Sequence, residues 1–189
     1  MLLATANGSF ARAARSAPVE LAQLKAAYVL NFARYTSWPD GSFDDATSPI
    51  VIGVAGDDAL GGFLEELVKG ETARGHPIDV RRIDVSAVGS SADDAALSAL
   101  AGRLRRVHVL FIGRGAQERA RWLLDRVEHL DVLTVSDVDD FAERGGMIGL
   151  VLRDRRLAFD VNLDRIQGSR VTLSSQVLRL ARIVVEKSS

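Results

Sequence analysis

The stretch LAQLKAAYVLNFARYTSWP, residues 21–39, decides how the rest of the chain must be arranged. Its large apolar side chains recur at spacings of three and four, as on one face of a helix, and smaller apolar residues fill much of the remainder. The recurring residues are Leu21, Leu24, Tyr28, Phe32 and Tyr35. Such a helix has to be covered on most sides. Because proline restricts the residue before it to an extended conformation, the helix is predicted to end before Trp38 and Pro39.

Apolar, β-branched runs alternate with helical patterns along the next hundred residues. These runs predict buried strands at 50–54, 107–112 and 132–135, and an imperfect alternation predicts a strand nearer the sheet edge at 77–85. Helices are predicted between the strands, at 59–68, 90–106 and 116–128, and a short helix is predicted from Ser136 to Phe141. An aspartate is expected to cap the first of these helices.

The C-terminal part of the chain has a different pattern. Residues 147–152 and 157–163 predict an antiparallel hairpin, and a serine at 174 or 175 is expected to start a final helix that runs to Glu186. Strands that alternate with helices indicate an α/β protein. We therefore expect a single-domain three-layer sandwich with a mixed, mostly parallel sheet of about 5–6 strands and a C-terminal β-hairpin and helix.

Length and composition fit one globular domain. The 189 residues are 47% hydrophobic and 26% charged, with a formal net charge of −1, so no bulk charge favours binding to nucleic acid. The absence of cysteine excludes disulfides, thiolate nucleophiles and Cys-ligated metals. Residues 1–18 are expected to be either the remnant of an export signal or a disordered extension, and residues 19–187 to form the domain.

Glycines in GVAGDDALGG, residues 53–62, offer the strongest resemblance to an enzyme loop. A phosphate loop would need a lysine and a hydroxyl residue at its end, whereas Asp57 and Asp58 place two carboxylates at the helix start. A structural turn is therefore the better interpretation. The same two aspartates suggest the metal site of a receiver domain, but Gly113 and Arg114 stand where that site needs an aspartate, and no lysine follows a later strand.

Histidines and arginines give no clearer indication of catalysis. His76, His108 and His129 lie on different predicted elements, without a spacing that would bind a metal from one element. The arginines at 153–156 are interrupted by Asp154 and lack interleaved aromatic residues, which favours a solvated turn over a nucleic-acid contact. The sequence therefore predicts no enzyme activity, no cofactor and no metal.

Three stretches together resemble one protein family. They are LKAAYVLNFARYTSWP at 24–39, FAERGGMI at 141–148 and LAFDVNLDRIQGSRVTLSSQVLRLARIV at 157–184. In combination they look like the YfiR-like family of small bacterial periplasmic proteins. This resemblance implies an exported, non-catalytic regulator that binds the periplasmic sensor region of an inner-membrane diguanylate cyclase and represses it, which controls cyclic di-GMP and biofilm formation. It also implies release by an outer-membrane lipoprotein and a homodimer.

Two parts of this pattern are candidates for the partner contact. Trp38 and Pro39 form the exit from the first helix, and Phe141, Gly145, Gly146 and Met147 precede the hairpin, where loops of α/β proteins often carry binding residues. A packing role would explain Trp38 equally well. The alternative function is a periplasmic sensor that binds a small ligand, which would require an apolar pocket with a few polar groups.

Overall fold

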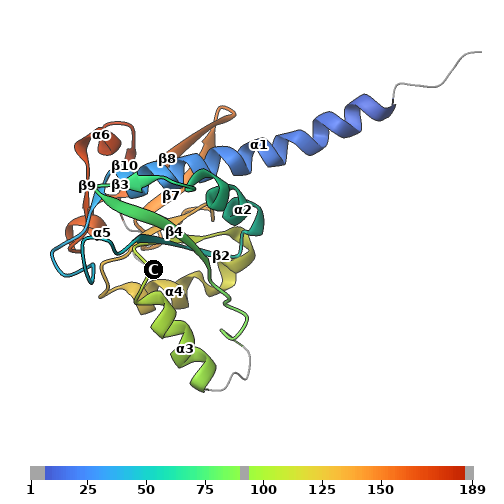
Figure 1. The fold of residues 1–189 in the computed structure, drawn as a ribbon. Helices are drawn as coiled ribbons and strands as arrows, with labels where there is room; N and C mark the ends of the chain where they lie inside the picture. The colour runs from blue at the N-terminus through green and yellow to red at the C-terminus, as the bar shows by residue number, and fades with distance from the viewer. Residues whose placement is uncertain (1–6, 90–93, 186–189) are drawn as a thin grey trace, which may run out of the picture.

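A mixed sheet forms the centre of the molecule (Figure 1). The computed structural model describes the backbone of residues 7–89 and 94–185, and the side chains from residue 18 onward outside that gap. Within this part of the chain, eight strands pair in the order β10-β8-β7-β6-β5-β2-β4-β3. They are β2 (Ile50–Ala55), β3 (Thr72–Ala73), β4 (His76–Arg82), β5 (Val109–Ile112), β6 (Leu133–Ser136), β7 (Ile148–Arg153), β8 (Arg156–Asn162) and β10 (Arg182–Val184).

The strands β4, β2, β5, β6 and β7 run parallel, whereas β7 and β8 form the predicted antiparallel hairpin. A separate pair joins β1 (Thr36–Ser37) to β9 (Thr172–Leu173) in antiparallel fashion. The expected α/β class, the mostly parallel sheet and the hairpin are thus confirmed. The sheet has more strands than predicted because β3 and β10 extend its two edges.

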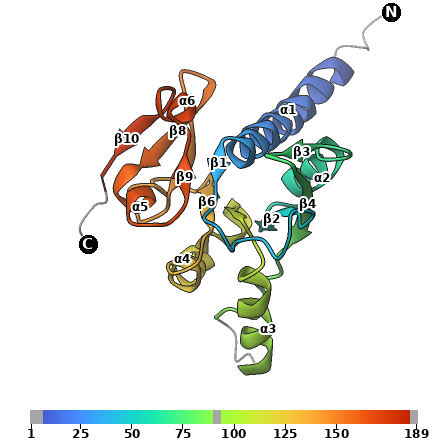
Figure 2. The same cartoon turned by 60° about the vertical axis from the view of Figure 1, so that its left-hand side comes forward.

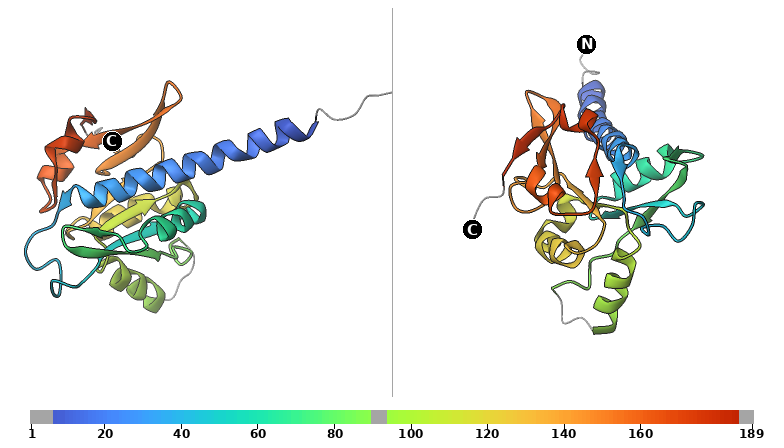
Figure 3. Two further views of the ribbon diagram at one scale, coloured as in Figure 1. Left: turned by 45° about the horizontal axis from the view of Figure 1, so that its top comes forward. Right: turned by 90° about the vertical axis from the view of Figure 1, so that its left-hand side faces the viewer.

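Helices cover both faces of the sheet (Figures 2 and 3). One face packs on α1 (Asn7–Arg34) and α2 (Asp58–Leu67). The other face packs on α3 (Asp94–Leu104) and α4 (Ala120–Val127). A 3₁₀ segment, η1 (Arg114–Arg119), directly precedes α4. Strand β2 shows the alternation that this arrangement requires, because Ile50, Ile52 and Val54 join the α1 side and Val51 and Ala55 the α4 side.

Helix α1 packs against the sheet through its small side chains. Ala26, Val29 and Ala33 are fully buried, and the Thr36 hydroxyl donates to the Phe32 carbonyl at 2.6 Å where the helix ends. The predicted end before the Trp-Pro pair is confirmed. The helix runs through Pro18 without a break, and its N-terminal part projects beyond the other layers (Figure 3). The domain boundary at residue 18 stays a prediction.

One predicted helix is wrong, and another is shorter than predicted. Residues 138–145 form turns, because Ser136 accepts from the Val138 N–H at 2.9 Å and Gly145 has a φ of 95°, so the chain folds back to start β7. The final helix begins where it was predicted, after the Ser174 cap, but it ends at Leu178 and not at Glu186. Short helices α5 (Leu163–Gln167) and α6 (Ser175–Leu178) are followed by β10, whose β-branched Ile183 and Val184 pair with β8.

Candidate partner-binding surface

Ligands of open α/β sheets commonly bind at the C-terminal edge of the strands, where the chain switches direction between two neighbouring strands. Here β2 and β5 are those neighbours, and glycine backbone fills the space between them. Gly113 donates to the Ala55 carbonyl at 2.7 Å and Gly115 to the Gly56 carbonyl at 3.1 Å. A Cβ on Gly56 would lie 2.3 Å from the Ala116 nitrogen. The loops leave no room for a ligand at this position.

The two aspartates after β2 have structural partners. Asp57 accepts from the Leu60 N–H at 2.9 Å and caps α2, as predicted, and Asp58 accepts from Arg82 at 3.0 Å. At the end of β6, Asp137 pairs with Lys25 of α1. These contacts favour the structural interpretation of the glycine turn over a phosphate loop.

At the opposite, N-terminal edge of the strands, aromatic rings gather around the loop of residues 38–49. Phe43 is stacked between His76 and His108, with ring centroids 4.0 Å and 4.5 Å away. The half-buried Trp38 meets Phe43 edge-on at 6.3 Å and donates from its indole nitrogen to the His108 carbonyl at 3.3 Å. We call Trp38, Phe43, His76 and His108 the ring cluster.

Backbone contacts fix the tautomer of His108. The Val51 N–H donates to Nδ1 at 3.1 Å, so the proton sits on Nε2, which donates to the Ser42 carbonyl at 3.0 Å. Burial lowers the pKa of His108 and outweighs the opposing effect of the Ser42 carbonyl. His76 Nδ1 contacts the Ser48 carbonyl at 2.7 Å. Among the residues described, no three potential metal ligands come together.

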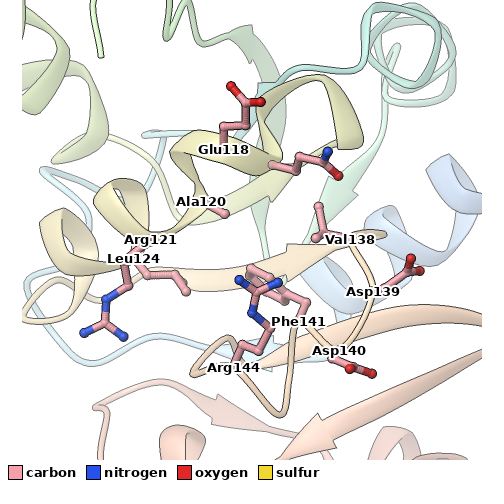
Figure 4. A pocket seen from close by; sticks show the side chains of 10 residues that line it. Glu118, Ala120, Arg121, Leu124, Val138, Asp139, Asp140, Phe141 and Arg144 are labelled. Atoms are coloured by element: carbon pink, nitrogen blue, oxygen red, sulfur yellow. The ribbon is translucent and has the colours of Figure 1, made fainter. Parts of the chain in front are cut away.

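The second predicted stretch is mostly buried. Phe141 is only 3% exposed, and a Cβ on Gly146 would lie 2.1 Å from its ring. Phe141 nevertheless lines a cavity of about 510 Å³ between the α4 side and the 138–144 turns, with Val138 and Arg144 (Figure 4). Met147 donates from its N–H to the Thr134 hydroxyl at 3.0 Å and is also buried.

The second stretch is divided between the two edges of the sheet, because Phe141 lines its cavity with Val138, just after the C-terminal end of β6, whereas the cavity of Gly145 and Met147 reaches the N-terminal edge at Val132. Trp38 and Pro39 line a separate cavity of about 330 Å³, and Gly145 and Met147 line one of about 220 Å³. Asp131 lies between them, because it accepts from Ser42 at 3.3 Å and from Arg170 at 2.8 and 3.0 Å. The contribution of this edge to binding stays a proposal.

Sequence reasoning missed several residues of this edge. The sequence shows only the spacing of the histidines along the chain. It cannot show that the pairing of β4, β2 and β5 brings His76 and His108 to opposite faces of the Phe43 ring. Asp131 and Arg170 had no recognisable pattern either, whereas Phe43 was noticeable only as an aromatic residue beside a predicted loop. They meet only through the parallel register of the strands and the loops that precede them.

A second surface lies on the α1 face. Residues of α1, β8 and α6 line a groove of about 560 Å³, namely Tyr28, Asn31, Phe32, Tyr35, Leu157, Ala158, Phe159, Gln176, Val177 and Leu180. Its lining is predominantly apolar, and the Leu180 side chain at its rim is 78% exposed. The helical spacing of Tyr28, Phe32 and Tyr35 was visible in the sequence, but not the strand that completes the groove.

Comparison with known proteins gives one result. A comparison with curated proteins finds no match. No helix in the described part of the chain is both long and apolar enough to cross a membrane. The model of the YfiR/HmsC-like family matches residues 22–182, which include all of the elements from β1 to β9. A match over most of the chain establishes membership, so the protein belongs to the YfiR/HmsC-like family.

Proposed function

We propose that this protein is a periplasmic, non-catalytic regulator that binds the periplasmic sensor region of an inner-membrane diguanylate cyclase and represses the enzyme. The observation that carries the proposal is the family match over residues 22–182. Repression lowers cyclic di-GMP and biofilm formation. An outer-membrane lipoprotein would relieve it by sequestering the regulator, and the regulator would act as a homodimer.

For the contact with the cyclase, we propose the N-terminal edge of the sheet. Trp38 and Pro39 lie on a loop that the ring cluster anchors to the strands, which would keep the binding surface rigid before the partner arrives. Gly145 and Met147 would contribute through the neighbouring cavity. Because the Phe141 ring is buried and lies near Val138, just after the C-terminal end of β6, its contribution would be indirect, through its packing against Gly146.

Reconstitution of the pair tests the proposal. The full chain is titrated against the purified periplasmic domain of a cyclase encoded next to it, and cyclic di-GMP is measured in cells with and without the regulator. We expect saturable binding and a rise in cyclic di-GMP when the regulator is deleted. Pro39→Ser, which changes a half-buried residue of the proposed contact, should weaken binding, whereas the distant, exposed Lys69→Ser should not. Unchanged cyclic di-GMP in the deletion strain would refute the repressor function.

A small-ligand sensor is the second candidate, and the groove between α1, β8 and α6 favours it. Its volume and its aromatic lining, with Asn31 and Gln176 as polar groups, fit the general features of a ligand site. A thermal-shift screen of small aromatic compounds would test this function. A hit that raises the melting temperature of the wild type but not of Leu180→Glu would support the groove, whereas equal shifts in both proteins would exclude it.

A further inference from the structure

A cavity with a strongly basic lining lies between β4 and α3, away from both surfaces described above. Its volume is about 550 Å³, and its lining consists of Arg81, Arg82, Ile83, Ala99, Gly102, Arg103 and Arg106. Four of these seven residues are arginines, and none is acidic. This local concentration of positive charge contrasts with the formal net charge of −1 of the whole chain.

The arginines of β4 already have partners. Arg82 binds Glu65 of α2 at 2.9 Å and Asp58 at 3.0 Å, and Arg81 binds Asp79 of its own strand at 3.0 Å. The Arg81–Asp79 pair is about half exposed on both sides, so water screens much of its attraction. Arg81 can therefore exchange this partner for a ligand at little cost.

Arg103 in the last turn of α3 and Arg106 just after the helix form no such bonds within the described part of the chain. The charge of Arg103 does add to the hydrogen bonds from Ser86 that lower the pKa of the nearby Asp84. Among the described residues, no side chain or carbonyl forms a hydrogen bond or salt bridge with the guanidinium groups of Arg103 and Arg106. The turn that follows the helix keeps them close together, because the Arg106 N–H donates to the Arg103 carbonyl at 3.1 Å and both residues line the cavity. Two guanidinium groups without a salt bridge that line one cavity repel each other, and an anion between them would reduce this repulsion.

The floor of the cavity leaves space for such an anion. Ile83 is buried, and Ala99 and Gly102 carry little or no side chain. A Cβ added to Gly102 would meet nothing within 4 Å. A ligand can thus approach the helix closely between the arginine side chains.

We propose that this cavity is a binding site for a phosphate-bearing anion, held by Arg103 and Arg106 with Arg81 as a third contact. A carboxylate carries one charge, whereas a phosphate or pyrophosphate group carries more and offers several oxygens to the guanidinium forks. The phosphate can belong to a free metabolite or to a lipid headgroup. This site is independent of the proposed binding to a cyclase.

Calorimetric titration of the full chain with pyrophosphate at low ionic strength tests the site. Saturable binding to the wild type is expected, and Arg106→Gln should weaken it by about tenfold, the effect of losing one charge-assisted contact. Arg105→Gln is the matched control, because this neighbour on the same chain segment removes an equal charge but does not line the cavity. It should leave the affinity within about twofold of the wild type.

A charge-neutral variant separates shape from charge. Gly102→Gln adds a side chain to the lining of the cavity and replaces a poor helix former, so the fold should be preserved while pyrophosphate binding falls. Sedimentation with phosphatidylglycerol vesicles distinguishes the two sources of phosphate. Binding to vesicles alone, lost in Arg106→Gln but not in Arg105→Gln, would support a headgroup ligand. Equal losses in these two variants, or no binding of either probe by the wild type, would overturn the proposal.

Discussion

Lys25 of α1 and Asp137 at the end of β6 form an ion pair in which the two side chains are only 15% and 6% exposed. The second carboxylate oxygen of Asp137 is buried and has no hydrogen-bond partner among the described residues. The pair fastens the long helix to the C-terminal edge of the sheet. Among the described residues, the loss of Lys25 would leave the buried carboxylate of Asp137 with only the more distant Arg114, whose Nε lies 4.0 Å from the oxygen that Lys25 contacts.

Replacement of Lys25 by methionine is therefore expected to lower the free energy of unfolding by about 3–5 kcal/mol. Urea denaturation would measure the change. Lys69→Met is the control, because Lys69 and Glu66 are 68% and 71% exposed and their pair should contribute less than about 1 kcal/mol. Lys25→Met combined with Asp137→Asn should recover part of the loss. Equal midpoints for Lys25→Met and Lys69→Met would contradict the prediction.

Acid is expected to destabilise the protein through His108. Burial lowers the pKa of this imidazole in the folded state, so the unfolded chain binds the proton more readily. The stabilisation is complete above the unfolded pKa of about 6.5 and decreases as the pH falls towards the folded value. Protonation would also break the bond in which Nδ1 accepts from Val51. The nearby charges of His76 and Arg81 oppose protonation, and Asp131 favours it.

The measurement is the urea midpoint between pH 7.5 and 5. His108→Gln retains an acceptor for Val51 but cannot titrate, so its stability should vary less with pH than that of the wild type. His129→Gln serves as the control, because His129 is exposed at the end of α4 and contacts no part of the ring cluster. An acid slope that stays unchanged in His108→Gln would show that other groups cause the destabilisation.

Trp38 and Phe141 should respond differently to truncation. Phe141→Ala removes a buried ring and is expected to cost about 3–5 kcal/mol of stability. Trp38 is half-buried beside an exposed loop, and if it contacts the partner, Trp38→Ala should weaken binding to the cyclase domain by about 2 kcal/mol while the protein stays folded. Urea midpoints and partner affinity are measured on the same two variants. Unchanged affinity in folded Trp38→Ala would remove this residue from the contact.

Gly146 is expected to tolerate no side chain. A Cβ there would lie 2.1 Å from the Phe141 ring, so Gly146→Ala must displace a buried aromatic group and should destabilise the fold by about 1–3 kcal/mol. Gly102→Ala is the matched control in open space, where alanine should stabilise α3 slightly. Thermal unfolding of the two variants compares them. Similar melting temperatures would mean that the Phe141 turn can relax at little cost.

Local patterns were sufficient for much of the fold. The strands β2, β5 and β6, the hairpin and the end of the first helix were each predicted within a few positions from periodic apolar residues, whereas α1 begins at Asn7, well before the predicted stretch at 21. The errors arose where tertiary contacts outweigh local preference. Leu178 and Ala181 continue a helical pattern, yet the chain leaves the helix because Arg182 can reach Asp160 of β8 at 2.7 Å and Ile183 can join the sheet.

The candidate surface was less accessible to sequence reasoning. Trp38 and Gly146 were noticed as members of recognisable stretches, but whether a ring is exposed depends on what covers it, as the burial of Phe141 shows. The arginines of the basic cavity illustrate the same limit. Arg81 and Arg106 are far apart in the chain and come together only because β4 and α3 pack side by side.

The pairing of β1 with β9 also determines when folding can finish. Thr36 at the end of the first helix pairs with Leu173, and the Ser174 N–H donates to the Tyr35 carbonyl at 2.9 Å. Strand β10 then completes the edge beside β8. Because these contacts join distant parts of the chain, their formation carries a large loop-closure entropy and should be slow. A nascent chain that lacks residues 172–184 would keep an unpaired strand edge, which exposes it to proteases and aggregation until synthesis is complete.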